Sequence, residues 1–269
     1  DSALVKYSKE YDNYDVQSAN ELEISKEECL EALKKISKEE LEALKFARSR
    51  IQEFSEHQKT KPWNYTSKGI TLGEKITAID KVGLYVPGGS AAYPSSVLMN
   101  SIPAKVAGVK EITMVFPSPK GKVNNMVLAA AYLGGVDRIF RIGGAHAVAA
   151  LAFGTDTIPK VNMIVGPGSQ YVAEAKKELY GEVGIDSFAG PSEILVIADS
   201  SANEEWIALD LFSQAEHDEL AQSILISPDE NLLKKVEKVM QDKLNNQERK
   251  NIIESSLNNF GLMIKVKDI

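Results

Sequence analysis

A glutamine and a histidine three residues apart are the side chains whose spacing first suggests chemistry. Gln214 and His217 follow Ile207 and Leu211 along a predicted helix at steps of three and four residues, so all four share one face. Because a buried amide or imidazole is costly without a partner, both groups need one. Either the partner is a divalent metal, or His217 is neutral and hydrogen-bonded while Gln214 is bonded to the backbone. Spacing alone favours the second interpretation, because Gln-x-x-His is far less specific than His-Glu-x-x-His.

A predicted strand and a helix start precede this pair. The apolar run from Ile194 to Ala198 is short and bounded by turn residues, which is typical of a strand buried on both faces of a parallel sheet. Ser201 and Glu204 have the spacing of a capping box, so we expect the helix to begin there. Ser192, in the turn before the run, lacks a Gly-x-Ser-x-Gly context, and hydrogen bonding to a ligand is a better interpretation than nucleophilic attack.

Four glycine-containing loops follow predicted strands. In an open parallel sheet such loops border the ligand crevice, where glycines admit a close backbone approach and helix N-termini attract anions. No loop matches the Gly-x-Gly-x-x-Gly fingerprint or a P-loop, and a single Gly-Pro or Gly-Gly pair is more often only a tight turn. His146 either faces the crevice or is partly buried. Together the loops predict a cleft bordered by Tyr85 with Pro87-Gly88-Gly89, Gly143-Gly144 with His146, Gly166-Pro167-Gly168 with Ser169, and Gly190-Pro191-Ser192.

Alternating strands and helices carry these loops. Strands separated by helices of this length imply right-handed crossovers and parallel sheets. We expect strands at 82–86, 111–116, 138–142, 161–165, 194–198, 223–227 and 262–266, and helices at 95–107, 124–133, 145–153, 170–179 and after residues 201 and 228.

The domain organisation follows from the same pattern. Residues 1–60 are charged and helical, with capping boxes at Ser25 with Glu28 and at Ser37 with Glu40. The segment from Lys59 to Gly73 has no clear period and is interpreted as a connecting loop. We predict an α/β fold of two Rossmann-like doubly wound parallel-sheet halves with an N-terminal helical segment: 1–60 helical, 61–160 the first half, and 161–269 the second, incomplete at its C-terminus.

Composition excludes several classes of protein. The chain of 269 residues is 43% hydrophobic and 26% charged, as in soluble globular proteins, and its formal net charge of −7 disfavours nucleic-acid binding. No apolar run has the length of a membrane span, and the first residues do not resemble a signal peptide. The single cysteine, Cys29, excludes an intrachain disulfide and is interpreted as a structural thiol. We expect a cytoplasmic protein.

At these motifs the sequence resembles the histidinol dehydrogenase family. The resemblance covers nearly the whole chain, and the matching stretches occur in the same order as in the family. It is carried by VGLYVPGGSAAYPSSVLMNSIPAKVAGV (82–109), IGGAHAVAALAFGT (142–155), IVGPGSQYVAEAKKELYG (164–181), and DSFAGPSEILVIAD (186–199) with SQAEH (213–217).

The resemblance implies a zinc-dependent enzyme that oxidises L-histidinol to L-histidine with two NAD in successive hydride transfers. On this basis Gln214 and His217 are zinc ligands that also touch substrate, and Ser192 hydrogen-bonds the substrate. Tyr85 lines the NAD site. His146 and Ser169 occupy NAD-contact positions where the family usually has glutamine and asparagine, which puts the affinity or pose of the cofactor in question.

The family's remaining catalytic groups are expected beyond Ile269. These are a Glu-His pair that acts as acid and base, an Asp zinc ligand, and a His ligand supplied by the partner chain of an intertwined homodimer. We therefore expect this chain to be inactive alone. The alternatives are a non-catalytic module that binds a nucleotide or an imidazole metabolite in the same cleft, and a different NAD-dependent alcohol or aldehyde dehydrogenase of similar fold.

Overall fold

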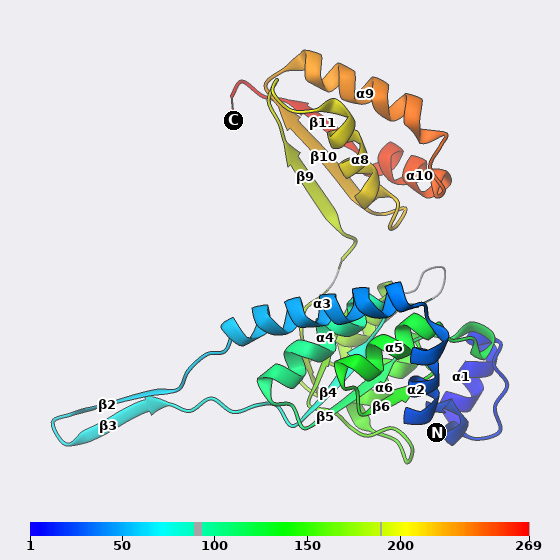
Figure 1. Ribbon diagram of the computed structural model, residues 1–269, viewed down its shortest axis with the longest axis vertical. Coiled ribbons are helices and arrows are strands. Elements are labelled where there is room, and N and C mark those ends of the chain that lie inside the picture. Colours follow the sequence, from blue (N-terminus) through cyan, green and yellow to red (C-terminus); the bar gives the residue numbers. More distant parts are fainter. Residues whose placement is uncertain (89–92, 189, 269) are drawn as a thin grey trace. The chain divides into compact units, whose positions relative to one another are not determined.

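The computed structural model describes residues 1–88, 93–188 and 190–268, and the chain forms two compact units. The first unit is Asp1–Ala189 and the second is Gly190–Ile269. Gly89, which belongs to one of the predicted loops, lies outside the described residues. The α/β class predicted from the sequence is confirmed, and Figure 1 shows the elements of each unit.

A six-stranded sheet organises the first unit, in the order β1-β6-β5-β4-β7-β8. All neighbouring strands are parallel except the pair of β1 and β6. The central strands β4, β5 and β6 are short, largely buried apolar runs, as in buried parallel sheets. The strands are β1 (Glu23–Ile24), β4 (Lys81–Tyr85), β5 (Glu111–Val115), β6 (Arg138–Phe140), β7 (Met163–Val165) and β8 (Gly184–Ile185).

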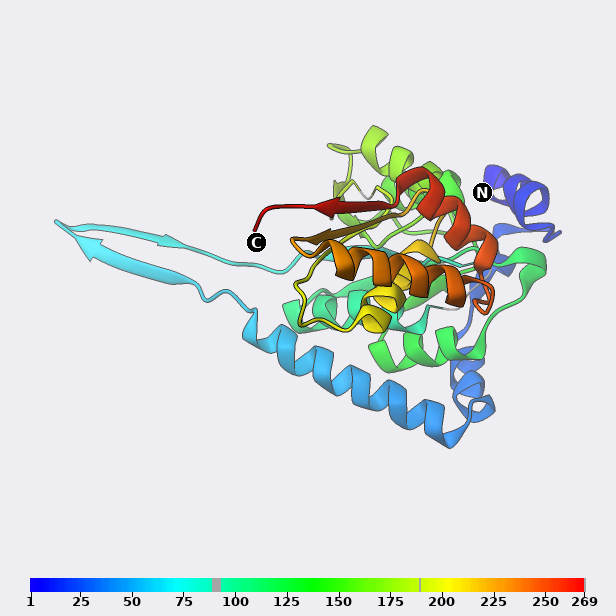
Figure 2. The same ribbon diagram turned by 90° about the horizontal axis from the view of Figure 1, so that it is seen from above.

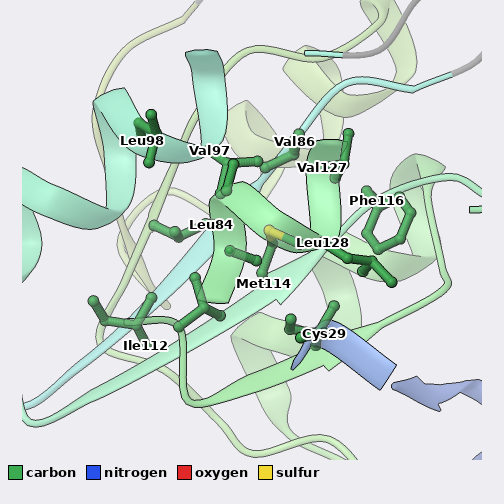
Figure 3. Packing of buried hydrophobic residues seen from close by; sticks show 14 of the residues in the cluster. Cys29, Leu84, Val86, Val97, Leu98, Ile112, Met114, Phe116, Val127 and Leu128 are labelled. Carbon is green, nitrogen blue, oxygen red and sulfur yellow. The ribbon is translucent and has the colours of Figure 1, made fainter. Parts of the chain in front are cut away.

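Helices cover both faces of this sheet, which makes it doubly wound. Because alternate strand residues point to opposite faces, Leu84 and Met114 pack under one helical layer while Tyr85 and Val115 pack under the other. Figure 3 shows the first of these clusters, with Cys29 among its residues. The first layer holds α2 (Lys26–Lys35), α3 (Lys38–His57), α4 (Pro94–Ala107) and α5 (Asn125–Gly134); the second holds α1 (Ser2–Asp12), α6 (Gly144–Phe153) and α7 (Gln170–Glu178).

The N-terminal helices belong to the core of the first unit. The two predicted capping boxes are confirmed: Ser25 and Ser37 accept hydrogen bonds from the Glu28 and Glu40 amides. Cys29, in α2, is 2% exposed, and burial raises the pKa of its thiol to about 11. A thiol this buried and this weakly acidic is structural.

The predicted boundary between residues 160 and 161 differs from the division in the structure. Strand β7 pairs in parallel with β4, and β8 continues the same sheet, so residues 161–188 complete the first unit. The partner of β7 lies about eighty positions earlier in the chain, a pairing that local periodicity does not encode.

The predicted connecting loop at 59–73 is wrong, because it contains a regular antiparallel hairpin. Strands β2 (Trp63–Ser67) and β3 (Ile70–Glu74) pair with Ser67 opposite Ile70, which leaves a two-residue turn. Lys68 and Gly69 in that turn have φ angles of 50° and 79°. Two successive positive φ values identify a type I′ turn, whose twist matches that of paired strands.

The second unit has a three-stranded parallel sheet in the order β11-β10-β9. The predicted burial of residues 194–198 on both faces is wrong: Leu195 and Ile197 are 53% and 55% exposed. The helices of this unit all pack on one sheet face, against Val196 and Leu225, and the opposite face has no cover within the described part of the unit. The elements are β9 (Glu193–Ile197), α8 (Glu204–Ala215), β10 (Gln222–Ser227), α9 (Glu230–Leu244), α10 (Lys250–Phe260) and β11 (Leu262–Lys265).

Among the residues with described positions, none of the helices has the length and apolarity that a bilayer crossing requires.

Candidate functional site

Three of the four predicted loops come together at the carboxyl edge of the first sheet. A Cβ on Gly88 would lie 2.7 Å from the Pro117 carbonyl oxygen, and one on Gly143 would lie 2.5 Å from the Pro117 Cβ. A Cβ on Gly166 would lie 2.1 Å from the carbonyl oxygen of Tyr85. The glycines therefore let the loops after β4, β5, β6 and β7 touch through their backbones. The fourth predicted loop, at residues 190–192, belongs to the second unit.

Tyr85 ends β4 inside this edge. Its side chain is 3% exposed, and its hydroxyl accepts a 2.9 Å hydrogen bond from the amide of Gly144 at the start of α6. Burial raises the pKa of the Tyr85 hydroxyl, an effect that the Gly144 amide opposes. The hydroxyl therefore stays protonated and keeps one hydrogen to donate.

His146 lies two residues further along α6. Its ring centroid is 5.3 Å from that of Tyr7 and 6.2 Å from that of Tyr11, both on α1. The Nε2 atom is buried without a hydrogen-bond partner in the described structure, and burial lowers the pKa of the imidazole. The ring is therefore neutral near pH 7, with one unused polar atom at the start of α6. The residue is half-buried, in agreement with the second of the two predicted alternatives.

Ser169 is exposed and is the N-cap residue of α7. Its hydroxyl makes no capping hydrogen bond. Its backbone carbonyl accepts from the amides of Val172 and Ala173. The side chain is thus available to a ligand that approaches the helix end.

A buried ion pair braces the loop before Ser169. Lys176, on α7, is 2% exposed and donates to a carboxylate oxygen of Asp186 and to the Gly166 carbonyl at 3.1 Å. The other Asp186 oxygen accepts from the Gly166 amide at 2.8 Å. Sequence reasoning missed this lysine, although it lies four residues after the buried Val172 and so continues the apolar face of α7.

In the second unit, the N-cap of α8 lies two residues after the predicted cap, Ser201. Asn203 is the N-cap, and its side chain accepts from the amides of Glu205 and Trp206. Ser201 instead donates its hydroxyl to Asp199. Asparagine is as good an N-cap residue as serine. The loop after β9 is longer than predicted, so Ser201 lies before the first turn of the helix.

The predicted common face of α8 is only partly correct. Ile207 and Leu211 are buried and Gln214 is half-buried in the last turn, but His217 is exposed beyond the helix end at Ala215. The helix stops before completing the turn that would bring the histidine onto the apolar face. His217 is therefore a surface imidazole at the C-terminus of α8, and its predicted burial is wrong.

The His217 imidazole has a defined tautomer. Its Nδ1 lies 2.7 Å from the carbonyl oxygen of Ser213. A carbonyl oxygen only accepts, so Nδ1 carries the hydrogen and a neutral ring leaves the Nε2 lone pair free. This is how metal-ligating histidines are oriented in proteins. With the Gln214 amide in the preceding turn, the donor chemistry fits part of a zinc site.

Ser192 precedes β9 and is exposed. Its carbonyl oxygen accepts from the Gln222 amide of β10 at 3.1 Å, so the backbone is held by the sheet while the hydroxyl faces solvent. Across the ranges that the structure describes, no three His, Cys, Asp or Glu side chains gather as a metal site. The candidate zinc donors and the predicted NAD contacts belong to different units.

Comparison with known proteins identifies the family. The family model described as histidinol dehydrogenase matches residues 1–269. The chain belongs to the histidinol dehydrogenase family. The histidinol dehydrogenase of Nitrosomonas europaea is 54% identical over 270 residues, which cover 100% of this chain and 62% of the relative. That of Pseudomonas savastanoi pv. phaseolicola is 53% identical, over 100% of this chain and 60% of the relative.

A solved structure supports the same assignment. The crystal structure of histidinol dehydrogenase from Elizabethkingia anophelis matches with a TM-score of 0.93 at 38% identity, covering 100% of this chain and 62% of that chain. The predicted family and fold class are thereby confirmed. The chain spans about three fifths of the length of the histidinol dehydrogenases that it matches.

Proposed function

We propose that this chain is the part of a histidinol dehydrogenase that binds NAD and contributes to a zinc-dependent substrate site. The reaction is the oxidation of L-histidinol to L-histidine in histidine biosynthesis, in the cytoplasm. Conversion of a primary alcohol to a carboxylic acid removes four electrons, so it consumes two NAD and one water. The observation that carries the proposal is the orientation of His217, three residues after Gln214, whose Nδ1 lies against the Ser213 carbonyl oxygen so that Nε2 is left free, in a chain that matches the family throughout.

The second unit supplies donors for metal and substrate. His217 offers its Nε2 lone pair and Gln214 its amide oxygen, while the exposed Ser192 hydroxyl is free to hydrogen-bond the substrate. Gln214 and His217 would hold a zinc ion, which would supply a Lewis acid that orients the substrate for oxidation. The Ser213 carbonyl fixes the His217 ring so that little rotational freedom is lost on binding.

The first unit supplies the cofactor contacts in this proposal. Tyr85 holds the start of α6 through its hydrogen bond with Gly144, and His146 Nε2 is an unsatisfied polar atom on that helix. The Ser169 hydroxyl stands at the N-terminus of α7, where the helix dipole favours an anionic group. Histidine and serine can still hydrogen-bond the cofactor at the positions where the family is expected to have glutamine and asparagine.

The proposal also covers what this chain does by itself. A catalytic zinc takes at least three ligands from protein, and Gln214 and His217 are only two. We therefore expect weak zinc binding and no turnover by residues 1–269 alone. The complete site is proposed to form in a homodimer that contains the remaining family ligands.

A chimera tests the proposed activity. This chain replaces the matching 270 residues of the Nitrosomonas europaea relative, and the intact relative is assayed in parallel. With zinc present, we expect two NADH for each L-histidine formed from L-histidinol, because each hydride transfer reduces one NAD. A folded chimera that makes no NADH while the intact relative does would contradict the proposal. Calorimetric binding of an imidazole metabolite without zinc or turnover would instead favour the non-catalytic module.

A further inference from the structure

Both backbone polar groups of Gly166 are bonded by charged side chains. The Gly166 amide donates to Asp186 at 2.8 Å, and the Gly166 carbonyl oxygen accepts from the Lys176 ammonium at 3.1 Å. Lys176 also donates to Asp186, so the three residues form a closed ring of hydrogen bonds. Two ionised side chains, which make stronger hydrogen bonds than neutral ones, are thus committed to one position in the loop that leads to Ser169.

Each member of this ring is anchored in a different part of the first unit. Lys176 belongs to α7, and Asp186 follows β8, where its own amide donates to the Ile164 carbonyl of β7 at 3.3 Å. Gly166 has a φ of 107°, and a Cβ on it would lie 2.1 Å from the Tyr85 carbonyl oxygen. The position of the loop is therefore set by its contact with Tyr85 and by the ion pair together.

The ring lies among the proposed cofactor groups of the first unit. Figure 2 shows α7 in yellow-green beside α6 in green, and these two helices carry Ser169 at the N-cap and His146 in the first turn. The chain passes from Gly166, against the Tyr85 backbone, directly to Ser169. A shift of the Gly166 peptide would therefore change the distance between Tyr85 and the N-terminus of α7.

Stability alone does not account for a lysine at this position. Lys176 is 2% exposed, and an apolar side chain of similar volume often stabilises a buried site as well as an ion pair does. An apolar side chain cannot donate to the Gly166 carbonyl oxygen. The ion pair thus gives the loop one conformation, which is what a binding site on a loop requires.

We propose that Lys176 and Asp186 are positioning residues for NAD. They fix Gly166 so that the Ser169 hydroxyl and the N-terminus of α7 stand where the anionic diphosphate of the cofactor binds. Lys176 is too deeply buried to touch the cofactor itself and acts through the loop. The proposal rests on the proposed function, in which Ser169 contacts NAD, and it adds the pair that sets the affinity of that contact.

Calorimetric titration of the chain with NAD tests the pair without turnover. Lys176→Met removes the donor to the Gly166 carbonyl and should raise the NAD dissociation constant about 10-fold or more, as expected for loss of a charge-assisted hydrogen bond. Lys177→Met is the matched control, because it makes the same substitution at the next residue of α7, whose side chain is 61% exposed and pairs with Glu174. The control should leave the constant within about 3-fold.

A double substitution keeps the test decisive if Lys176→Met disturbs folding. Lys176→Met with Asp186→Asn leaves no unpaired charge, so the variant should unfold in urea near the midpoint of the unaltered chain. It should still weaken NAD binding at least as much as Lys176→Met, because the Gly166 carbonyl again lacks its donor.

Kinetics in the chimera separate positioning from stability. Both variants should raise KM for NAD about 10-fold or more and leave KM for L-histidinol within about 3-fold. A purely structural role would lower the folded fraction, and with it kcat, while both KM values stay unchanged. If the chain alone binds NAD too weakly to titrate, these KM values decide.

Two results would overturn the positioning role in an active chimera. One is a folded variant whose dissociation constant and KM for NAD equal those of the unaltered protein. The other is an equal rise of KM for both substrates. An unaltered chimera that makes no NADH would instead reject the proposed function, and the positioning role with it.

Discussion

Replacing Asp186 by alanine is expected to lower the free energy of unfolding of this chain by about 3 kcal/mol, because it leaves a buried ammonium without its counter-charge. The Lys176 side chain is 2% exposed, whereas Asp186 is 32% exposed. Removing the carboxylate also leaves the Gly166 amide without its partner at the loop before Ser169. Urea unfolding followed by circular dichroism measures the change.

Two further variants show whether the lone buried charge causes this loss. Lys176→Met should cost less than Asp186→Ala, because methionine fills similar space and the remaining carboxylate keeps the Gly166 and Ser187 amides as partners. Glu174→Ala breaks an exposed pair with Lys177 on the same helix and should change stability by less than about 1 kcal/mol. Equal losses in all three variants would contradict the role of burial.

The second large effect is expected at His217. In the chimera, His217→Ala should lower kcat/KM for L-histidinol by at least about 100-fold. Loss of a group that only hydrogen-bonds a metal ligand lowers activity by up to about 100-fold, and loss of the ligand itself should lower activity at least as much. The residue is exposed, so the truncation should leave the fold intact. The assay is initial-rate NADH formation in zinc-containing buffer.

His57 provides the matched control for this substitution. It is an exposed histidine at the end of α3, in the first unit, and is not one of the residues of the proposed site. His57→Ala should retain the kcat/KM of the chimera. If His217→Ala retains it as well, His217 is not a ligand in the active enzyme.

Sequence reasoning located the strands and loops around Tyr85, His146 and Ser169 because each lies beside an apolar run that ends at glycine or proline. Those signals are local, and the structure confirms the strands at these loops. The family resemblance was needed to assign roles to Gln214 and His217, since their spacing alone favoured ordinary hydrogen bonding. The roles themselves stay predictions.

Sequence reasoning did not predict the unit boundary or the exposed face of β9, which depend on residues distant in the chain, or the β2–β3 hairpin, which depends on its turn. The pairing of β7 with β4 placed the boundary between units after residue 189 instead of 160. The exposed face of β9 depends on which side of the sheet three later helices occupy. The hairpin could have been predicted from local sequence, since Lys68-Gly69 separates two strands with alternating apolar residues. It was missed because lysine is an uncommon residue at a positive φ.

The most direct test of the central claim is nitrogen NMR of the histidine side chains in this chain, recorded at about pH 8, where an ordinary imidazole is neutral. We predict that His217 has its hydrogen on Nδ1, as the contact with the Ser213 carbonyl requires, and that excess zinc shifts its Nε2 resonance while His57 responds less. A hydrogen on Nε2, or a His217 resonance that zinc does not move, would contradict the account.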